Sequence, residues 1–438
     1  CYSQSSLTRV FKFQSKQVKF KLRLDMDGEE LTEHETALYD RQIRVWGADA
    51  QRRLSKSRIL VSGLKGTVIE FCKNVVLAGV GSLTLNDDRM VSEDLLSSNF
   101  LIPPDENAYA GKSLAELCCD SLKDFNPMVQ VSVVKGGPFP FILQMFLACE
   151  CRDLSSFTVD FFDKFDVVVI SSCSLSIKQS VNEKCRKLSK RIAFYTVDCR
   201  DSCGEIFVDL QNYIYSKKKC DKNAECLLEY PSFEEAISVP WKSLPRRVSK
   251  LYLAMREELS FLTFCANLHG QLCVWTSWKG LLVACLGFNE VMLYWIWLAL
   301  VQSTDSIIVC SMIERYEELE NRSPGDTSAA DLPYIQKLKK ELCEANSVNE
   351  SQIPDSLLER LLEGRREFPP VCAVVGGILG QEVIKAISGK GDPLMNFFFF
   401  DAMDGKGVIE DISKEKSGKG IIEDISKHTS GDSFVAVV

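Results

Sequence analysis

A predicted buried strand runs directly into a glycine turn at residues 57–66, which read Ser57-Arg58-Ile59-Leu60-Val61-Ser62-Gly63-Leu64-Lys65-Gly66. A helix is predicted from Thr67 to Ala78, and a second strand from Ser82 to Leu85 that ends at Asn86-Asp87-Asp88. A strand, a glycine turn, a helix, a second strand and an acidic residue together indicate a βαβ unit.

Apolar runs further along the chain extend this unit into a sheet. Strands are predicted at residues 129–134, 167–170 and 192–197, with helices between them, and four consecutive phenylalanines at 397–400 predict another buried strand. The alternation predicts an α/β fold. We expect a doubly wound, mostly parallel, Rossmann-like sheet with a smaller helical lobe inserted between residues 213 and 368.

The glycine turn has lost part of what a nucleotide-binding turn needs. Such a turn places glycines where the backbone approaches phosphate and where the helix packs on the strand. Gly63 and Gly66 remain, but Lys65 and Val68 stand where glycine is expected. Asp87 follows at the distance where an acid would bind a ribose. The pattern predicts a degenerate remnant of a nucleotide site, and the alternative is a βα turn that binds nothing.

The composition argues against one class of partner and indicates the state of the cysteines. The formal net charge is −8, which argues against nucleic acid, because that partner favours clustered Lys and Arg. The 18 cysteines include no C-x-x-C spacing, so we expect buried, reduced thiols. A zinc site from Cys199 and Cys203, or from Cys220 and Cys226, is the alternative.

The first 25 residues differ from the rest of the chain. They carry six basic groups and no acid before Asp25, a composition that resembles a transit peptide. The stretch that begins at Met26 is acidic and is typical of an ordinary soluble N-terminus. We therefore predict that residues 1–25 are a non-native leader.

Two internal segments, residues 137–152 and 257–311, are rich in Trp, Phe, Leu and Cys without clean periodicity. We interpret them as atypical insertions. The second contains an uncharged run from Ser260 to Trp278, so a membrane segment is an alternative. Polar residues lie inside that run and no basic flank would orient it, so we expect no membrane partner.

The C-terminus contains a short repeat. Residues 405–413 recur as residues 418–426, with Val408 replaced by Ile421. Two copies are too few for a solenoid, so residues 414–438 are predicted to be a solvated tail with a local duplication.

Several motifs resemble those of the activating enzymes for ubiquitin-like proteins. The resemblance covers most of residues 32–136, 153–256 and 312–413. It implies that residues 26–212 and 369–413 form a Rossmann-like adenylation half, with a helical lobe at 213–368. The motifs are Tyr39-Asp40-Arg41-Gln42-Ile43-Arg44-Val45-Trp46-Gly47, Gly63-Leu64-Lys65-Gly66, Asn99-Phe100-Leu101-Ile102, Asp124-Phe125-Asn126-Pro127-Met128-Val129 and Gly376-Gly377-Ile378-Leu379-Gly380-Gln381-Glu382-Val383-Ile384-Lys385.

In this family two related halves pair and only one of them adenylates. The active half carries a Gly-x-Gly-Gly-x-Gly turn, an Asn, an Arg and a magnesium-binding Asp. Those last three positions correspond here to Ser97, Ser98 and Cys173. Serine cannot neutralise a triphosphate, and a neutral thiol is a poor ligand for magnesium. The resemblance therefore implies the inactive half, with no cofactor or metal of its own, and Gly63, Gly66 and Asp87 as the degenerate remnant.

The resemblance is to the smaller, non-catalytic subunit of the SUMO type. It implies a heterodimer with a catalytic subunit that holds ATP and magnesium, adenylates the C-terminus of SUMO and carries the thioester on its own cysteine. It also implies a nuclear protein that is found in the cytoplasm as well. The alternatives are the small subunit of a NEDD8-activating enzyme, a membrane-anchored scaffold, and an NAD-dependent oxidoreductase, whose glycines and acid–base group are missing.

Three groups are candidates for a direct part in the chemistry. The resemblance assigns Arg41 to the triphosphate held by the partner, in trans, since a guanidinium offers a planar fork of donors to phosphate. Alternatively, Arg41 pairs with Asp40 or Glu35 on a solvated helix. Cys185 and Cys199 each precede an arginine, but we expect neither to carry SUMO, because the family places the thioester in the partner.

Overall fold

A computed structural model gives the fold of the chain. It describes residues 31–105, 109, 111–134, 154–219, 222–239, 244, 248–255, 327–346, 349–362 and 367–412. The predicted leader, both predicted insertions and the predicted tail lie outside these residues, so the structure does not bear on them.

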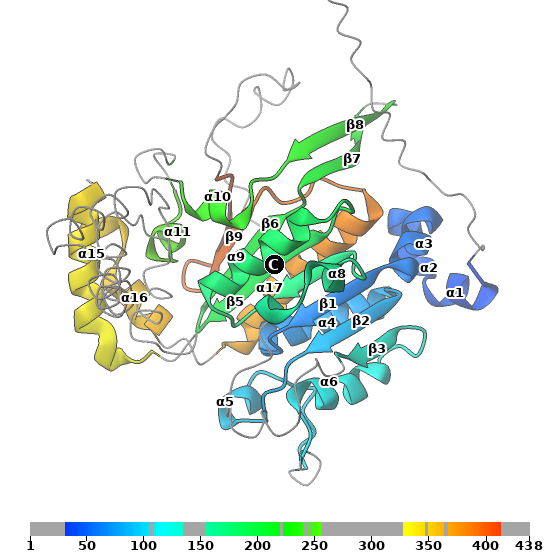
Figure 1. The fold of residues 1–438 in the computed structure, drawn as a ribbon, viewed down its shortest axis with the longest axis horizontal. Helices are drawn as coiled ribbons and strands as arrows, with labels where there is room; N and C mark the ends of the chain where they lie inside the picture. Colours follow the sequence, from blue (N-terminus) through cyan, green and yellow to red (C-terminus); the bar gives the residue numbers. More distant parts are fainter. Residues whose placement is uncertain are drawn as a thin grey trace, which may run out of the picture.

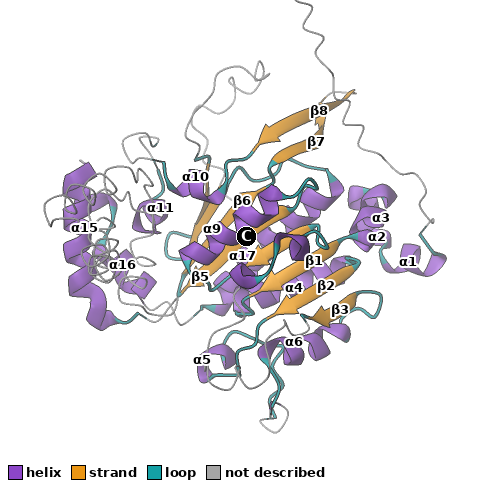
Figure 2. Ribbon diagram, viewed as in Figure 1, coloured by secondary structure: helices purple, strands orange, loops and turns teal. Residues whose placement is uncertain are grey.

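An eight-stranded sheet forms the centre of the molecule, in the order β10-β9-β6-β5-β4-β1-β2-β3 (Figures 1 and 2). The five strands from β3 to β5 are parallel, and β6, β9 and β10 continue the sheet in antiparallel fashion. This confirms the predicted α/β fold. The strands are β1 (Arg58–Ser62), β2 (Ser82–Asn86), β3 (Gln130–Val133), β4 (Val167–Ile170), β5 (Ala193–Arg200), β6 (Cys203–Asp209), β9 (Phe397–Asp401) and β10 (Lys406–Glu410).

Helices cover both faces of this sheet. One buried cluster joins the sheet to α3, α4, α6 and α17, and the other joins it to α8, α9, α10, α11, α15 and α16. The helices are α1 (Glu33–Leu38), α2 (Asp40–Trp46), α3 (Ala48–Lys56), α4 (Gly66–Ala78), α5 (Glu93–Leu96), α6 (Leu114–Lys123), α8 (Val159–Phe162), α9 (Leu175–Lys187), α10 (Phe233–Ile237), α11 (Lys250–Met255), α15 (Leu332–Asn346), α16 (Asp355–Leu362) and α17 (Pro369–Ser388).

The central strands are apolar throughout because both of their faces are buried. In β1, Ile59 and Val61 pack on one face of the sheet and Leu60 on the other. The four phenylalanines divide in the same way, with Phe397 and Phe399 on one face of β9. Unbroken apolar runs are typical of strands covered on both sides, which is why β1, β4 and β9 could be predicted from the sequence alone.

The range predicted as a helical lobe does not begin with a helix. Strands β7 (Asn212–Lys219) and β8 (Lys222–Glu229) form a two-stranded hairpin there. Tyr213 and Tyr215 point to the same side and stack 6.0 Å apart, and the Tyr213 hydroxyl donates to the carbonyl of Lys385 in α17. The alternation of buried tyrosines is a strand pattern, so the expected helix was wrong for this stretch. Further along, α15 and α16 are helical.

Helix α17 lies against both α4 and the sheet. It is the one described helix that is long and apolar enough to cross a membrane, and 61% of its most apolar window is buried inside the protein. Gly376 lets it approach α4 closely, because a Cβ at that position would lie 2.6 Å from the carbonyl oxygen of Thr67. The apolar composition of α17 is therefore explained by packing in the core.

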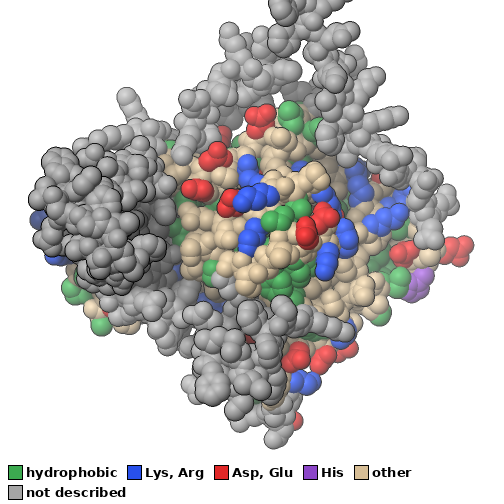
Figure 3. Space-filling view, viewed as in Figure 1, with side chains coloured by type: hydrophobic (Ala, Val, Ile, Leu, Met, Phe, Trp, Pro, Cys, Tyr) green, Lys and Arg blue, Asp and Glu red, His purple; other side chains and the backbone are tan. Residues whose placement is uncertain are grey.

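Charges of both signs are interspersed over the described part of the face in Figure 3. Exposed apolar side chains occur on elements that meet around Tyr39, whose hydroxyl accepts a hydrogen bond from Asn126 and whose ring lies against Gly79. We call them the Tyr39 surface: Leu38, Val45, Leu77, Phe125 and Met128.

The packing of α17 on α4 predicts opposite effects for two adjacent glycines. Gly376→Ala should lower the free energy of unfolding by about 1–3 kcal/mol, because the new Cβ overlaps the backbone of α4. Gly377 has no atom within 4 Å of the equivalent position. Gly377→Ala should therefore leave stability unchanged or raise it by about 0.5–1 kcal/mol, since alanine favours the helix. Urea denaturation of the full-length chain measures both, and equal effects would contradict the close approach.

Candidate functional site

The glycine turn lies at the carboxyl end of β1, where nucleotides bind in open α/β sheets. Gly63 has a φ of +83°, and a Cβ there would lie 2.1 Å from the carbonyl oxygen of Ser171. Only glycine fits this position, because the turn presses against the backbone that follows β4. Gly63 is therefore required by the fold itself, whether or not a nucleotide binds.

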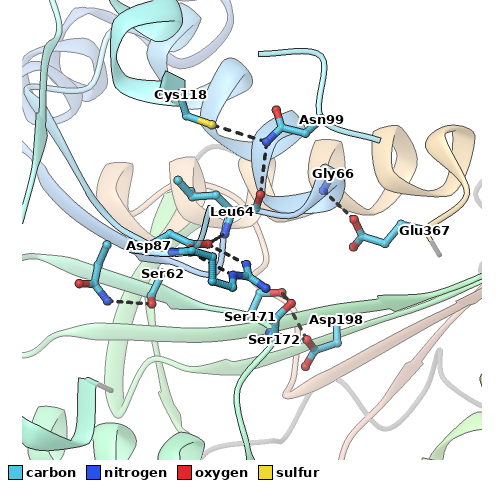
Figure 4. Close-up of polar contacts among 12 residues, drawn as sticks. Ser62, Leu64, Gly66, Asp87, Asn99, Cys118, Ser171, Ser172, Asp198 and Glu367 are labelled. Carbon is cyan, nitrogen blue, oxygen red and sulfur yellow. Dashed lines mark hydrogen bonds and ion pairs between the residues drawn. The ribbon is translucent and has the colours of Figure 1, made fainter. Parts of the chain in front are cut away.

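The first backbone N–H of α4 is occupied by a carboxylate of the same chain. The Gly66 N–H donates to Glu367 Oε2 over 2.6 Å (Figure 4). The Thr67 hydroxyl donates to Glu367 Oε1 over 3.3 Å. The start of a helix carries unpaired N–H groups and a partial positive charge, so it attracts anions. Glu367 thus occupies the place that a phosphate takes in a working site.

The backbone around Glu367 fixes it in this position. Glu367 forms a parallel bridge with Asp201, and the Phe368 N–H donates to the Asp201 carbonyl over 3.1 Å. α17 begins at the next residue, Pro369. A Cβ on Gly66 would lie 2.7 Å from the Cβ of Ser98 and 3.0 Å from Glu367 Oε2. Gly66 is therefore needed for contact with this chain's own side chains.

The carboxyl group of Glu367 titrates differently from one in water. Burial raises its pKa above the ordinary value of 4.5, and Lys65, the Gly66 N–H and the Thr67 hydroxyl offset part of this rise. A buried carboxylate costs free energy unless it is paired and hydrogen-bonded. The helix start supplies those hydrogen bonds here.

Asp87, predicted as the remnant of a ribose-binding acid, is also occupied. Its side chain is fully buried, and Oδ2 accepts from the Leu64 N–H over 2.8 Å. Arg89 binds the same carboxylate through two nitrogens, at 3.0 Å and 2.7 Å. Both oxygens therefore have partners within the chain, and Asp87 holds the glycine turn against the loop that follows β2 (Figure 4).

A second acid at this edge is neutralised in the same way. Asp198, near the end of β5, forms an ion pair with the buried Lys178 at 2.7 Å. It also accepts from the Ser172 N–H at 2.9 Å and from the Ser171 hydroxyl at 3.3 Å. Ser172 has a φ of 55°, so this bond stabilises an unusual backbone conformation. Asp87, Asp198 and Glu367 therefore each have donors within the described part of the chain.

The family positions for Asn, Arg and Asp can now be placed. Ser98 is buried against Gly66, Ser97 is exposed beside it, and Cys173 is half-buried in the turn after β4. The structure thus brings Gly63, Gly66, Asp87 and these three residues to one edge of the sheet. It adds Glu367, which sequence reasoning missed because nothing local in the sequence marks a glutamate that will be buried about 300 residues from its partner.

The zinc pair Cys199 and Cys203 does not form. Cys199 packs in the cluster on the α4 face of the sheet and Cys203 in the cluster on the α9 face, so their thiols lie on opposite sides. Cys199 instead lies with Glu367 and Cys372, whose ligand atoms are within 4.8 Å of one another. The hydrogen bond with the neighbouring Cys372, and then burial, raise the pKa of Cys199, and Glu367 already has its own donors. Cys220, of the other suggested pair, lies outside the described residues.

Neither cysteine considered as a nucleophile is activated. Burial raises the pKa of Cys185, and the nearby Asp209 raises it further. The pKa of Cys199 is raised as well, and both side chains are buried. Because the thiolate is the nucleophile, a raised pKa and a buried sulfur both disfavour thioester chemistry. That neither cysteine carries SUMO stays a prediction.

Arg41 lies at the other end of α4 from the glycine turn. The side chain of its neighbour Gln42 donates to the carbonyl of Leu77, 11 residues beyond Gly66, which corresponds to roughly 17 Å along the helix. The suggested partners of Arg41 are engaged elsewhere, since Asp40 pairs with Arg44 at 2.8 Å and Glu35 caps α1. Arg41 is exposed, with no hydrogen bond or ion pair to any residue that the structure describes. It cannot act on the turn of its own chain.

Comparisons with known proteins identify a family and close relatives over most of the chain. The chain matches the ThiF family over residues 39–419. It is 58% identical over 388 residues to SUMO-activating enzyme subunit 1B-1 of Arabidopsis thaliana, covering 89% of this chain and 99% of the relative. Subunit 1A of the same plant is also 58% identical, covering 89% and 98%. SUMO-activating enzyme subunit 1 of Homo sapiens is 29% identical over 383 residues, covering 87% and 96%.

The raised pKa of Glu367 predicts a pH-dependent stability. Between the ordinary pKa of 4.5 and the higher folded-state value, the folded chain keeps a proton that the unfolded chain has released. This group's contribution to stability therefore falls as pH rises through that window. Glu367→Gln removes the titration, so the unfolding free energy of the variant minus that of the wild type should rise with pH.

Urea denaturation at pH 5 and pH 8 measures this difference. Glu359→Gln is the matched control, because Glu359 is exposed in α16 and has none of these contacts. If the unfolding free energy of Glu367→Gln minus that of the wild type stays constant or falls between pH 5 and pH 8, the buried carboxylate at the start of α4 is contradicted.

Proposed function

This chain belongs to the ThiF family, and we propose that it is the small subunit of a heterodimeric SUMO-activating enzyme. The relatives of that name from Arabidopsis thaliana and from human align over nearly their whole lengths. The same relatives do not favour the small subunit of a NEDD8-activating enzyme or a membrane-anchored scaffold. The chain is thus one part of an enzyme whose other part performs the chemistry.

In the proposed enzyme the partner binds ATP and magnesium, adenylates the C-terminus of SUMO and carries the thioester. This chain binds no nucleotide and no metal. The observation that carries this division of labour is the Glu367 carboxylate on the first N–H of α4. A fixed carboxylate there repels phosphate, the adjacent Lys65 interacts with this carboxylate, and Ser97 and Ser98 supply no further cation.

The Tyr39 surface supports a partner beside Arg41. Val45 is 81% exposed on α2, the helix that carries Arg41, and Leu38 is 52% exposed at the end of α1. Exposed apolar side chains grouped in this way are typical of interfaces between proteins. We therefore place the catalytic subunit against α1, α2 and the end of α4, which would bring Arg41 to the triphosphate in the partner's site.

Partners and location follow from the same proposal. We expect SUMO and the catalytic subunit as partners, no nucleic acid and no membrane, and residence in the nucleus and also in the cytoplasm. The net charge of −8 favours protein partners over nucleic acid.

The occupied helix start predicts that the isolated chain does not bind ATP. Titration calorimetry of the full-length chain with ATP and magnesium should give no binding at micromolar concentrations. The assembled heterodimer is the control and should bind one nucleotide per pair. A micromolar dissociation constant for the lone chain would contradict its assignment as the inactive half.

The exposed guanidinium of Arg41 predicts a selective loss of adenylation in the heterodimer. Arginine fingers in phosphoryl transfer are worth roughly 10³–10⁵ in rate. We expect less from Arg41→Ala, about 10- to 1000-fold in ATP–pyrophosphate exchange, since the partner keeps its own cations. Arg44→Ala is the matched control, because Arg44 lies one turn away and only pairs with the exposed Asp40. Small and equal losses from both variants would contradict a role in trans.

A further inference from the structure

Three residues attach the edge strand β10 and the residues just after it to the rest of the molecule. The first is Gly407, which stands opposite Phe400 in the sheet. A Cβ at this position would lie 2.6 Å from the ring of Phe398, so only glycine lets the strand lie flat on β9. The exposed Val408 and Ile409 contribute less to this attachment.

The other two residues, Glu410 and Ile412, lie at the end of β10 and two residues beyond it. Glu410 is buried, and its Oε1 accepts from the Ser249 N–H over 2.7 Å, which ties the end of β10 to the start of α11. Ile412 is 1% exposed and packs in the cluster on the α9 face. Its N–H donates to Asn396 Oδ1 over 2.9 Å, and its carbonyl accepts from Asn396 Nδ2.

The repeat contains the same three residues 13 positions later in the sequence. Gly420 corresponds to Gly407, Glu423 to Glu410 and Ile425 to Ile412. The one change among the nine residues replaces Val408 with Ile421, and Val408 is 40% exposed, so the extra methylene meets no barrier in the core. A second segment of the same chain therefore carries every residue that the edge of the sheet selects.

We propose that residues 418–426 exchange with residues 405–413 at the edge of β9, so that either copy forms the last strand of the sheet. The exchange is within one molecule. When the second copy is bound, the connection from β9 lengthens from residues 402–405 to residues 402–418. The exchange makes the outermost strand replaceable while β9 and the interior stay as they are.

Chain entropy sets the balance between the two copies. Closing a loop about four times longer favours the first copy by roughly tenfold. One further contact also favours the first copy, because Lys250 pairs with Asp404 at 2.6 Å and the second copy has Ser417 at that place. The second copy is therefore the minor occupant, in about a tenth of the molecules or fewer.

Substitution of the buried isoleucines tests the exchange in the full-length chain. Ile412→Asp should lower the folding equilibrium constant by only about tenfold, because the second copy then takes the place of the first. Ile425→Asp should have almost no effect. The double variant should lose at least 100-fold, since neither copy can then avoid burying an unpaired carboxylate. Urea denaturation measures all three.

Two controls separate this proposal from its alternatives. Deletion of residues 414–438 should not affect the wild type but should turn Ile412→Asp into the equivalent of the double variant. The pair Glu410→Ala and Glu423→Ala repeats the test with a milder change if the double aspartate variant does not fold. If Ile412→Asp alone matches the double variant, the exchange does not occur. A rescue that grows with protein concentration would place the tail on a second molecule and would overturn the proposal too.

Discussion

The close approach of α17 to α4 determines the geometry of the whole glycine turn. Gly376 allows the two helices to touch backbone to backbone. This contact brings the start of α17, and with it Glu367, to the first turn of α4. The rest of the site then follows, because Gly66 and Ser98 pack around the carboxylate. A larger residue at Gly376 would move the anion away from the helix start.

Three charged groups lie at the edge where a nucleotide binds in related folds, and each is neutralised from within the chain. Asp87 is bound by Arg89, Asp198 by Lys178, and Glu367 by the start of α4. The polar groups at this edge thus bind one another. Buried polar networks of this kind fix one arrangement of the backbone when every member has a partner. In the proposed heterodimer, a rigid inactive half would hold Arg41 steady for the partner.

The sequence was informative where burial leaves a local pattern. The apolar runs of β1, β4 and β9 and the glycine turn predicted the α/β fold, because strands covered on both faces are apolar throughout. The hairpin at residues 212–229 was missed, since its alternation of tyrosines is short and lies in a range assigned to helices. Glu367 could not be found in this way, because its partners are distant in sequence. Asp87 was singled out as a remnant ribose-binding acid, which stays a prediction, and its ion-pair partner Arg89, two residues away, was overlooked.

The contact between Gly66 and Glu367 spans 301 residues, and this separation affects how the chain is made. At ribosomal speeds of about 5–20 residues per second, roughly 15–60 s pass between the synthesis of α4 and that of its carboxylate. During that interval β9 and α17 are still missing, so the apolar faces of β1, β4 and β5 are only partly covered, by the earlier helices α4, α6 and α9. A nascent chain in that state exposes aggregation-prone surface, and a chaperone that shields the early strands until residue 401 has emerged would raise the yield of folded protein.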